Sequence, residues 1–153
     1  MSALPRSPRA IDDDGLALIR HFEGFSATVY VCPAGYPTIG YGHVVTAGES
    51  WPTPLTTEQG EALLRRDMAR YERAVCRLIE VPLTDPCYAA LVSFTYNLGE
   101  GALAASTLRR LVNRGELRAA ADQFGRWVQS PAGILPGLVR RRAAEREMWV
   151  AGL

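Results

Sequence analysis

The stretch that decides the fold runs from Glu23 to His43 and reads EGFSATVYVCPAGYPTIGYGH. It carries a carboxylate on Glu23, a thiol on Cys32 and a hydroxyl on Thr38, separated by residues that favour turns. We expect these three groups to face one cleft and to act together on a bound substrate. The alternative is a small hairpin whose polar side chains merely face water.

The stretch itself is predicted to fold as a β-hairpin. Residues 28–32 alternate in polarity and are rich in β-formers, and residues 36–41 provide the returning strand. The segment 33–35, which reads Pro-Ala-Gly, is a turn signal between them. The hairpin therefore brings Thr38 back toward the side on which Cys32 lies.

Residues 11–22, just before this stretch, are predicted to form a helix. Aspartates at 12–14 place negative charge where a helix N-terminus favours it, and apolar residues recur at helical spacing. Glu23 follows Ile19 by four residues and continues the apolar stripe, and Gly24 then ends the helix.

Glu23 is therefore predicted to turn inward at the end of this helix. Burial of a carboxylate is costly, and it is tolerated where the group pairs with a base or keeps a proton for use as an acid. The residues alone leave two interpretations open. Glu23 is either a catalytic acid or a partner in the more common structural ion pair with an arginine.

The remainder of the chain is predicted to be helical, with loops at 44–55 and 130–136. The expected helices are 56–80, 84–98, 106–114, 117–128 and 137–150. Thr56 and Gln59 resemble a capping box at the start of the first of these helices, whose roughly 24 residues would span ~36 Å. That length suits a strut between two lobes, and an ordinary core helix is the alternative.

The 153-residue length fits one domain, and its charge is uneven along the chain. Residues 1–100 carry 8 arginines and 12 acidic residues, residues 101–153 carry 9 arginines and 4 acidic residues, and there is no lysine. Arginine forks suit carboxylate and phosphate partners, so the C-terminal part is either a surface for an acidic partner or a solvated face. The net charge of +1 is too modest to predict a nucleic-acid partner.

Arginines 140–142 lie near the start of the last predicted helix. Cations at a helix N-terminus oppose its dipole. We therefore expect one of these arginines to have an acidic partner elsewhere in the chain.

The three cysteines, Cys32, Cys76 and Cys87, argue against a disulfide framework because their number is odd and their spacing unpaired. They fit a protein made in a reducing cytoplasm. Cys76 is expected to be a buried apolar filler. Two histidines are too few for a metal cluster, so we expect no metal and no cofactor.

Residues 1–10 hold two prolines and two arginines and are expected to be a loose lead-in without the apolar core of a signal peptide. No run approaches the roughly 20 apolar residues of a membrane span. No membrane anchor is therefore expected.

These residues resemble the phage-type lysozymes, or endolysins, whose signature is Glu, eight residues, Asp or Cys, five residues, Thr. Glu23, Cys32 and Thr38 match that spacing. Four further segments look like later blocks of the same family: LVSFTYNLG at 91–99, STL at 106–108, RW at 126–127 and GLVRRR at 137–142. The resemblance covers roughly residues 11–150, in order.

The resemblance implies a lysozyme-like α+β fold, mostly α, in which a long helix joins a small β-hairpin lobe to a helical lobe. Residues 1–153 would form one domain: a β-rich lobe at 24–55, a connecting helix at 56–80, and a helical lobe at 81–153 on which helix 11–23 packs. A monomer is expected.

The resemblance also implies an N-acetylmuramidase, which hydrolyses the β-1,4 bond between N-acetylmuramic acid and N-acetylglucosamine in peptidoglycan. Glu23 would be the general acid that protonates the leaving oxygen. Thr38 and Cys32 would hold the attacking water, which favours inversion. A thiolate at Cys32 that attacks the sugar directly would instead give retention, and Cys32 as a packing residue is a further alternative.

Other assignments carried over from the family concern the cleft and the partners. Tyr96 and Asn97 are expected to line the cleft and bind substrate, with core packing the alternative for Tyr96. His43 is expected to be a hinge or packing residue. The protein would be made in the host cytoplasm and reach the periplasm or cell wall through a separately encoded holin.

Two rival functions remain open at this point. One is a non-catalytic peptidoglycan-binding module descended from a lysozyme, favoured by the thiol where other members carry a carboxylate. The other is a chitinase-like specificity on the same fold.

Overall fold

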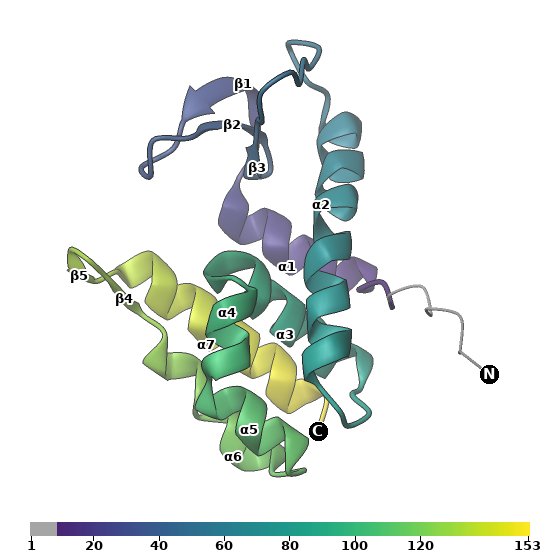
Figure 1. The fold of residues 1–153 in the computed structure, drawn as a ribbon, viewed down its shortest axis with the longest axis vertical. Coiled ribbons are helices and arrows are strands. Elements are labelled where there is room, and N and C mark those ends of the chain that lie inside the picture. Colours follow the sequence, from purple (N-terminus) through teal and green to yellow (C-terminus); the bar gives the residue numbers. More distant parts are fainter. Residues whose placement is uncertain (1–8) are drawn as a thin grey trace.

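The computed structural model describes residues 9–153, which form two parts (Figure 1). Seven α-helices are present in this range: α1 (Asp13–Glu23), α2 (Thr57–Leu78), α3 (Asp85–Leu98), α4 (Glu100–Ala105), α5 (Thr107–Asn113), α6 (Leu117–Ala121) and α7 (Pro136–Ala151). A 3-10 helix, η1 (Phe124–Arg126), follows α6. The strands are β1 (Ser26–Val31), β2 (Pro37–Gly40), β3 (His43–Val44), β4 (Gln129–Ser130) and β5 (Gly133–Ile134). The predicted α+β, mostly α, architecture is thus confirmed.

The β-lobe is an antiparallel sheet in the order β1-β2-β3. Thr38 of β2 pairs with Tyr30 of β1 and with Val44 of β3, so the predicted hairpin forms and gains a short third strand. Beneath it lies a small core of buried Ile39, Leu55 and Leu63, with Val45 and Trp51 packed against it.

Helix α2 connects this lobe to the helical lobe, and Figure 1 shows it running from the sheet down to the remaining helices. Its N-terminus carries the predicted capping box, in which Thr56 and Gln59 bond to each other's backbone N–H groups. Leu63 belongs to the core of the β-lobe, whereas Leu64 and Met68 belong to the main core. One amphipathic helix therefore holds two hydrophobic clusters at a fixed spacing.

Helix α3 is the centre of the helical lobe, since its residues 87–95 are all buried. It packs against α1, α2 and α7, as expected of a helix that is apolar on every side. The approach to α1 is close: a Cβ atom at Gly15 would stand 2.7 Å from Ala89 Cβ. This packing anchors α1, whose last residue is Glu23, on the helical lobe.

Three sequence expectations are wrong. Residues 117–128 do not form one helix, because Phe124 turns into the core against Phe94 and Trp149 and the chain continues as η1. The expected loop 130–136 contains the β4–β5 hairpin, whose turn uses Gly133 at φ +103°. Cys76 is exposed rather than a buried filler, and Cys87 is the buried cysteine.

The ends of the chain add two observations. Of the expected lead-in, only Arg9 and Ala10 lie within the described residues, and Arg9 pairs with Asp85. Within residues 9–153, no helix combines the length and the apolar character that crossing a bilayer requires.

Candidate active site

The Glu23 carboxylate lies where the two lobes meet. Glu23 is the last residue of α1, and Gly24 ends the helix at φ +67°. Its side chain is 21% exposed, and its Oε1 lies 2.7 Å from Nη1 of Arg141 on α7. Of the three arginines at 140–142, Arg141 is therefore the one that pairs with Glu23.

The other carboxylate oxygen of Glu23 faces the β-lobe. A Cβ atom at Gly42 would stand 2.7 Å from Glu23 Oε2 and 3.4 Å from the Tyr96 hydroxyl. The Tyr96 hydroxyl donates to the carbonyl of Tyr41 at 3.1 Å. Glycine at 42, at φ +80°, thus lets the β2–β3 turn touch the acid.

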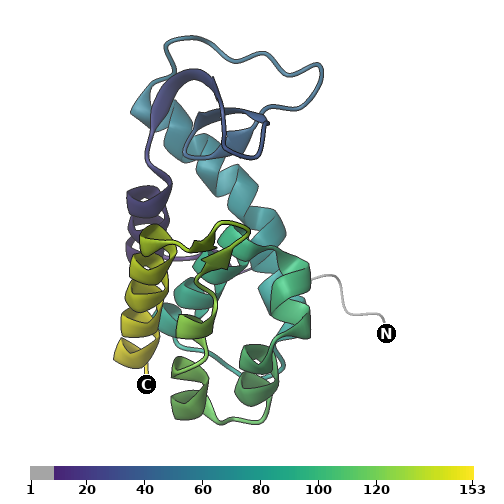
Figure 2. The ribbon, with the colours of Figure 1, turned by 90° about the vertical axis from the view of Figure 1, so that its left-hand side faces the viewer.

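A hollow of about 550 Å³ opens beside Glu23. It is formed by the end of α1, the end of α3 and the start of α7, and its lining residues are His21, Phe22, Glu23, Asn97, Leu135, Pro136, Gly137, Leu138, Arg140 and Arg141. In Figure 2 the three-stranded sheet lies above the β4–β5 hairpin and the start of α7. One side of the Glu23 carboxylate is thus open to a ligand. Arg141 and the β2–β3 turn, which contains Gly42, contact its other sides.

The two expected substrate-binding residues have different positions. Asn97 lines this hollow, and its side-chain oxygen accepts a hydrogen bond from Arg142. Tyr96 is not among the lining residues and packs edge-on against Tyr71. Burial, and then the negative charge of Glu23, raise the pKa of the Tyr96 phenol, so the hydroxyl stays protonated and donates to the β2–β3 turn.

Cys32 and Thr38 meet at the opposite end of the β1–β2 hairpin. Cys32 follows β1, and its backbone N–H donates to the Tyr36 carbonyl at 2.9 Å while its carbonyl accepts from Gly35 at 2.8 Å, which closes the turn. Hydrogen bonding from the backbone of Tyr36 lowers the pKa of the Cys32 thiol, and hydrogen bonds from the backbone of Ala34 and Gly35 act in the same direction against burial. The thiol is thus drawn toward its thiolate form.

Thr38 is buried, at 3% exposed, and its hydroxyl donates to the Tyr36 carbonyl at 3.0 Å. A hydroxyl has one proton and two lone pairs. With the proton directed to Tyr36, a lone pair of Thr38 is available to accept from a water.

Sequence reasoning missed Gly42, Ser93 and Glu145. Glu145 is fully buried on α7 and lies within 3.4 Å of Arg141 and 3.0 Å of Arg142. Its spacing of four and three residues from these arginines was the available signal, because residues three and four apart share a helix face.

Metal ligation has no candidate in the part of the chain that the structure describes. Within residues 9–153, no group of three or more His, Cys, Asp or Glu side chains is placed to hold an ion.

The comparison with known families identifies the fold. Residues 20–145 match the family model for phage lysozyme. The chain belongs to the phage lysozyme family. The Glu23, Cys32 and Thr38 signature lies inside the matched range.

Individual relatives in the phage lysozyme family differ in length. An endolysin of Bacillus phage B103 is 39% identical over 93% of this chain, but the match covers 54% of that protein. This chain thus spans about half the length of the Bacillus phage endolysins that it matches. An endolysin of Acyrthosiphon pisum secondary endosymbiont phage 1 is 38% identical over 91% of this chain and 97% of its own length.

Solved structures give the same fold. The muramidase domain of SpmX from Asticaccaulis excentricus has a TM-score of 0.84 at 35% identity, covering 93% of this chain and 99% of that domain.

Proposed function

We propose that this chain is an endolysin that hydrolyses peptidoglycan as an N-acetylmuramidase, cutting the β-1,4 bond between N-acetylmuramic acid and N-acetylglucosamine. The observation that carries the proposal is the Glu23 carboxylate, mostly enclosed and held between Arg141 and the Gly42 turn beside an open hollow. Membership of the phage lysozyme family supports it. The SpmX domain, a solved relative, is itself described as a muramidase.

Glu23 is the proposed general acid. A glycosidic oxygen leaves only when it is protonated, and a carboxyl group within hydrogen-bond reach supplies the proton. Departure of the oxygen leaves oxocarbenium-like charge on the sugar, which a water must quench. The ionised Glu23 that remains faces this charge and stabilises it.

Cys32 and Thr38 are the proposed holders of that water. The Thr38 oxygen accepts one water proton, and the sulfur, with its lowered pKa, accepts the other. A water bound through both protons presents its lone pair to the anomeric carbon. As the water oxygen bonds to the anomeric carbon, the Cys32 sulfur takes one of the water protons, and attack from the face opposite the acid inverts the anomeric configuration.

A non-catalytic peptidoglycan-binding module is the second candidate. The 2.7 Å contact between Glu23 and Arg141 favours it, because a guanidinium partner stabilises the ionised carboxylate and opposes its use as an acid. The thiol at position 32, in place of a carboxylate, points the same way.

Hydrolysis of purified peptidoglycan by Glu23→Gln tests the first proposal. The variant is expected to lose on the order of 10²-fold or more in rate, the scale of a general acid. Glu61→Gln is the matched control, because Glu61 also pairs with an arginine, Arg20, but lies on α2 and is 42% exposed. Equal rates for Glu23→Gln and the wild type would exclude the assignment, and wall binding without hydrolysis by the wild type would establish the binding module.

Product analysis tests the bond. Borohydride reduction of the products is expected to convert N-acetylmuramic acid, and not N-acetylglucosamine, into the terminal sugar alcohol. Glucosaminitol ends would instead indicate cleavage of the other bond. NMR of the first-formed anomer then separates inversion by a water from retention by a Cys32 adduct.

Access to the wall is a separate step. Peptidoglycan lies outside the inner membrane, so we propose that the protein is made in the host cytoplasm and passes a membrane opened by a separate holin. Expression in a Gram-negative host without holin is expected to leave cells intact, and addition of chloroform is expected to lyse them at once. Lysis without either treatment would contradict this route.

A further inference from the structure

A fully buried carboxylate, Glu145, lies behind the Glu23 contact. Glu145 is 0% exposed, and its Oε2 accepts a hydrogen bond from the Ser93 hydroxyl at 2.6 Å. Its two oxygens lie 3.0 Å from Arg142 Nε and 3.4 Å from Arg141 Nε. Helices α3 and α7 therefore bury Glu145 and Arg142 completely, and Arg141 reaches from them to the hollow beside Glu23.

Arg141 is shared between the two carboxylates. Its Nη1 lies 2.7 Å from Glu23, its Nε lies 3.4 Å from Glu145, and its Nη2 donates to the Ser93 carbonyl at 3.2 Å. Each nitrogen of the guanidinium thus has a different partner. The rigid fork of arginine fixes where its Nη1 meets Glu23, and Glu145 and Ser93 fix the fork.

Some polar atoms of this buried cluster lack hydrogen-bond partners. Arg142 Nε and Glu145 Oε1 lie 3.0 Å apart, yet they are not aligned for a hydrogen bond, and Arg142 Nη1 finds no partner among residues 9–153. Buried polar atoms without partners are rare and call for a reason. Replacement of a buried ion pair by apolar residues is often neutral or stabilising, so packing alone does not explain these charges.

We propose that Glu145 is a positioning residue for the catalytic acid. Together with Ser93 it holds the guanidinium fork of Arg141, which fixes where Nη1 meets Glu23, and its charge offsets part of the Arg141 charge at that contact. The inference rests on the proposed function of Glu23 as a general acid.

The charges around the acid give the direction of the effect. Arg141 and Arg142 contribute two cations, and Glu23 and Glu145 contribute two anions, so the ionised cluster is neutral. Burial raises the pKa of Glu145, and Arg142, Arg141 and the Ser93 hydroxyl oppose that rise. The two guanidinium groups favour its ionised form. Other titratable groups that face Glu23 are Tyr96, Arg140 and His21.

Removal of the Glu145 charge would leave Glu23 as the only carboxylate that pairs with Arg141. Arg141 would then hold the ionised form of Glu23 more strongly, and the active, protonated form would disappear at a lower pH. In Glu145→Gln, the alkaline limb of the pH–rate profile for peptidoglycan hydrolysis is expected to move down by about one pH unit, the scale of one charge at short range. The rate near neutral pH falls accordingly.

Two further variants separate this role from a structural one. Glu72→Gln is the matched control, because Glu72 is also buried, at 6% exposed, and accepts a backbone hydrogen bond from Ile11, just before the start of α1, whereas Glu23 is at its end. It is expected to lower the melting temperature without moving the alkaline limb. Ser93→Ala keeps every charge but removes the 2.6 Å hydrogen bond that stabilises ionised Glu145, so it is expected to move the limb in the same direction by a smaller amount.

The outcomes are distinct. A downward shift in Glu145→Gln and Ser93→Ala, absent in Glu72→Gln, supports the proposal. If Glu145→Gln is soluble and its alkaline limb is unchanged, the proposal is overturned, whatever the melting temperature of the variant. If Glu145→Gln does not fold, the alkaline limb of Ser93→Ala decides. If Glu23→Gln keeps wild-type activity, the proposed function itself is wrong. That failure is measured on Glu23→Gln, so it can be distinguished from failure of the role proposed for Glu145.

Discussion

Gly42 lies directly against the carboxylate of Glu23, so that a Cβ atom at Gly42 would stand 2.7 Å from Glu23 Oε2. This contact joins the β2–β3 turn of one lobe to the end of α1 in the other. The Tyr96 hydroxyl closes the same junction by donating to the Tyr41 carbonyl. The position of the acid therefore depends on a residue without a side chain.

Gly42→Ala is expected to displace the Glu23 carboxylate, because the atom it meets is the movable end of a side chain. Misplacement of a catalytic group by ~1 Å can reduce a rate on the order of 10²-fold, and we expect a loss of that size in peptidoglycan hydrolysis. The left-handed backbone at φ +80° adds a destabilisation of about 1–2 kcal/mol.

Gly115→Ala is the control for that backbone effect. Gly115 has φ +79°, and its Cβ would meet no atom within 4 Å. It is expected to lose similar stability and keep its hydrolysis rate. Equal rate losses in the two variants would show that strain, and not contact with Glu23, is responsible.

Arg141→Met is expected to destabilise the protein strongly. Arg141 is 5% exposed and contacts two carboxylates, one of them fully buried. Removal of one partner from a buried ion pair typically costs about 3–5 kcal/mol, because the remaining charge stays buried. Denaturant unfolding measures the loss directly.

Arg146→Met is the matched comparison on the same helix. Its partner is Asp122, and both side chains are more than half exposed. Exposed pairs contribute about 0–1 kcal/mol, so this variant is expected to unfold almost as the wild type does. A loss in Arg141→Met that is no larger than in Arg146→Met would mean that the buried cluster adds little to stability.

Much of the fold could be predicted because its signals are local. The capping box of Thr56 and Gln59, the turn at 33–35 and the glycine after Glu23 each act over a few residues, and the structure confirms all three elements. The helix dipole predicted an acidic partner for one of the arginines at 140–142. The structure confirms this, because Arg141 pairs with Glu23 and Arg142 lies beside Glu145.

The missed features depend on tertiary packing. Nothing in the sequence near Gly42 indicates that its turn meets Glu23, because that contact depends on how the β-lobe sits against the end of α1. Glu145 reads as a solvated helix charge, and only burial of α7 against α3 makes it a core residue. The β4 and β5 strands have two residues each, too few to show an alternating pattern.

The Cys32 thiol is expected to react as a thiolate at a lower pH than an ordinary cysteine. The backbone of Tyr36, aided by Ala34 and Gly35, lowers its pKa in the folded protein. In a background of Cys76→Ser and Cys87→Ser, which leaves Cys32 as the one thiol, the rate of alkylation by iodoacetamide is expected to reach half its plateau below the usual ~8.5.

The same measurement in denaturant provides the reference, because the turn that supplies the N–H donors is then lost. The midpoint is expected to return to about 8.5. Identical midpoints in the folded and unfolded chains would refute the effect of the turn. If alkylation at Cys32 also leaves hydrolysis intact, the sulfur does not hold the water.

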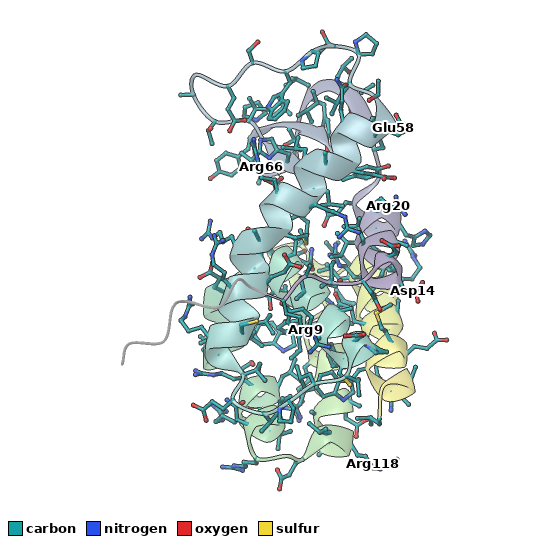
Figure 3. The ribbon with its side chains drawn as sticks, turned by 90° about the vertical axis from the view of Figure 1, so that its right-hand side faces the viewer. Arg9, Asp14, Arg20, Glu58, Arg66 and Arg118 are labelled. Atoms are coloured by element: carbon teal, nitrogen blue, oxygen red, sulfur yellow. The ribbon has the colours of Figure 1, made fainter. Side chains whose placement is uncertain are left out.

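His43 is expected to make stability depend on pH, because it fastens the loop after β3 to the connecting helix. Its Nδ1 lies 2.7 Å from Asp67 on α2, and its Nε2 lies 2.8 Å from Glu49 in the loop. Trp51 donates to the same Glu49 carboxylate and stacks with Arg66, which Figure 3 shows on the part of α2 near this loop. A neutral imidazole has one N–H, so only the charged form can donate to both carboxylates.

The pKa values of His43 and Asp67 set the upper end of the pH range in which this cluster stabilises the folded protein. Burial works to lower the pKa of His43, but its hydrogen bonds to Glu49 and Asp67 outweigh burial and raise it. The stabilisation from His43 is therefore complete below the ordinary histidine value of about 6.5 and is lost as the pH rises through the folded-state value. Burial raises the pKa of Asp67, which also weakens the folded state at higher pH.

The pKa of Glu49 sets the lower end of this pH range. The hydrogen bond from His43, with those from Thr46 and Trp51, lowers the pKa of Glu49 from 4.5 to about 2. Its stabilisation is present above 4.5 and is lost as the pH falls toward 2. The loop is thus held most firmly between about pH 4.5 and 6.5.

Comparison of the wild type with His43→Gln tests this window. The difference in unfolding free energy is expected to be largest near pH 5.5 and to shrink by pH 8.5, because neutral His43 gives up one of its two carboxylate bonds. His21→Gln, a change of the exposed histidine on the last turn of α1, is expected to show no such change between the two pH values. A difference for His43→Gln that grows from pH 5.5 to pH 8.5 would reverse the sign and show that burial of the neutral imidazole, rather than its charge, holds the loop.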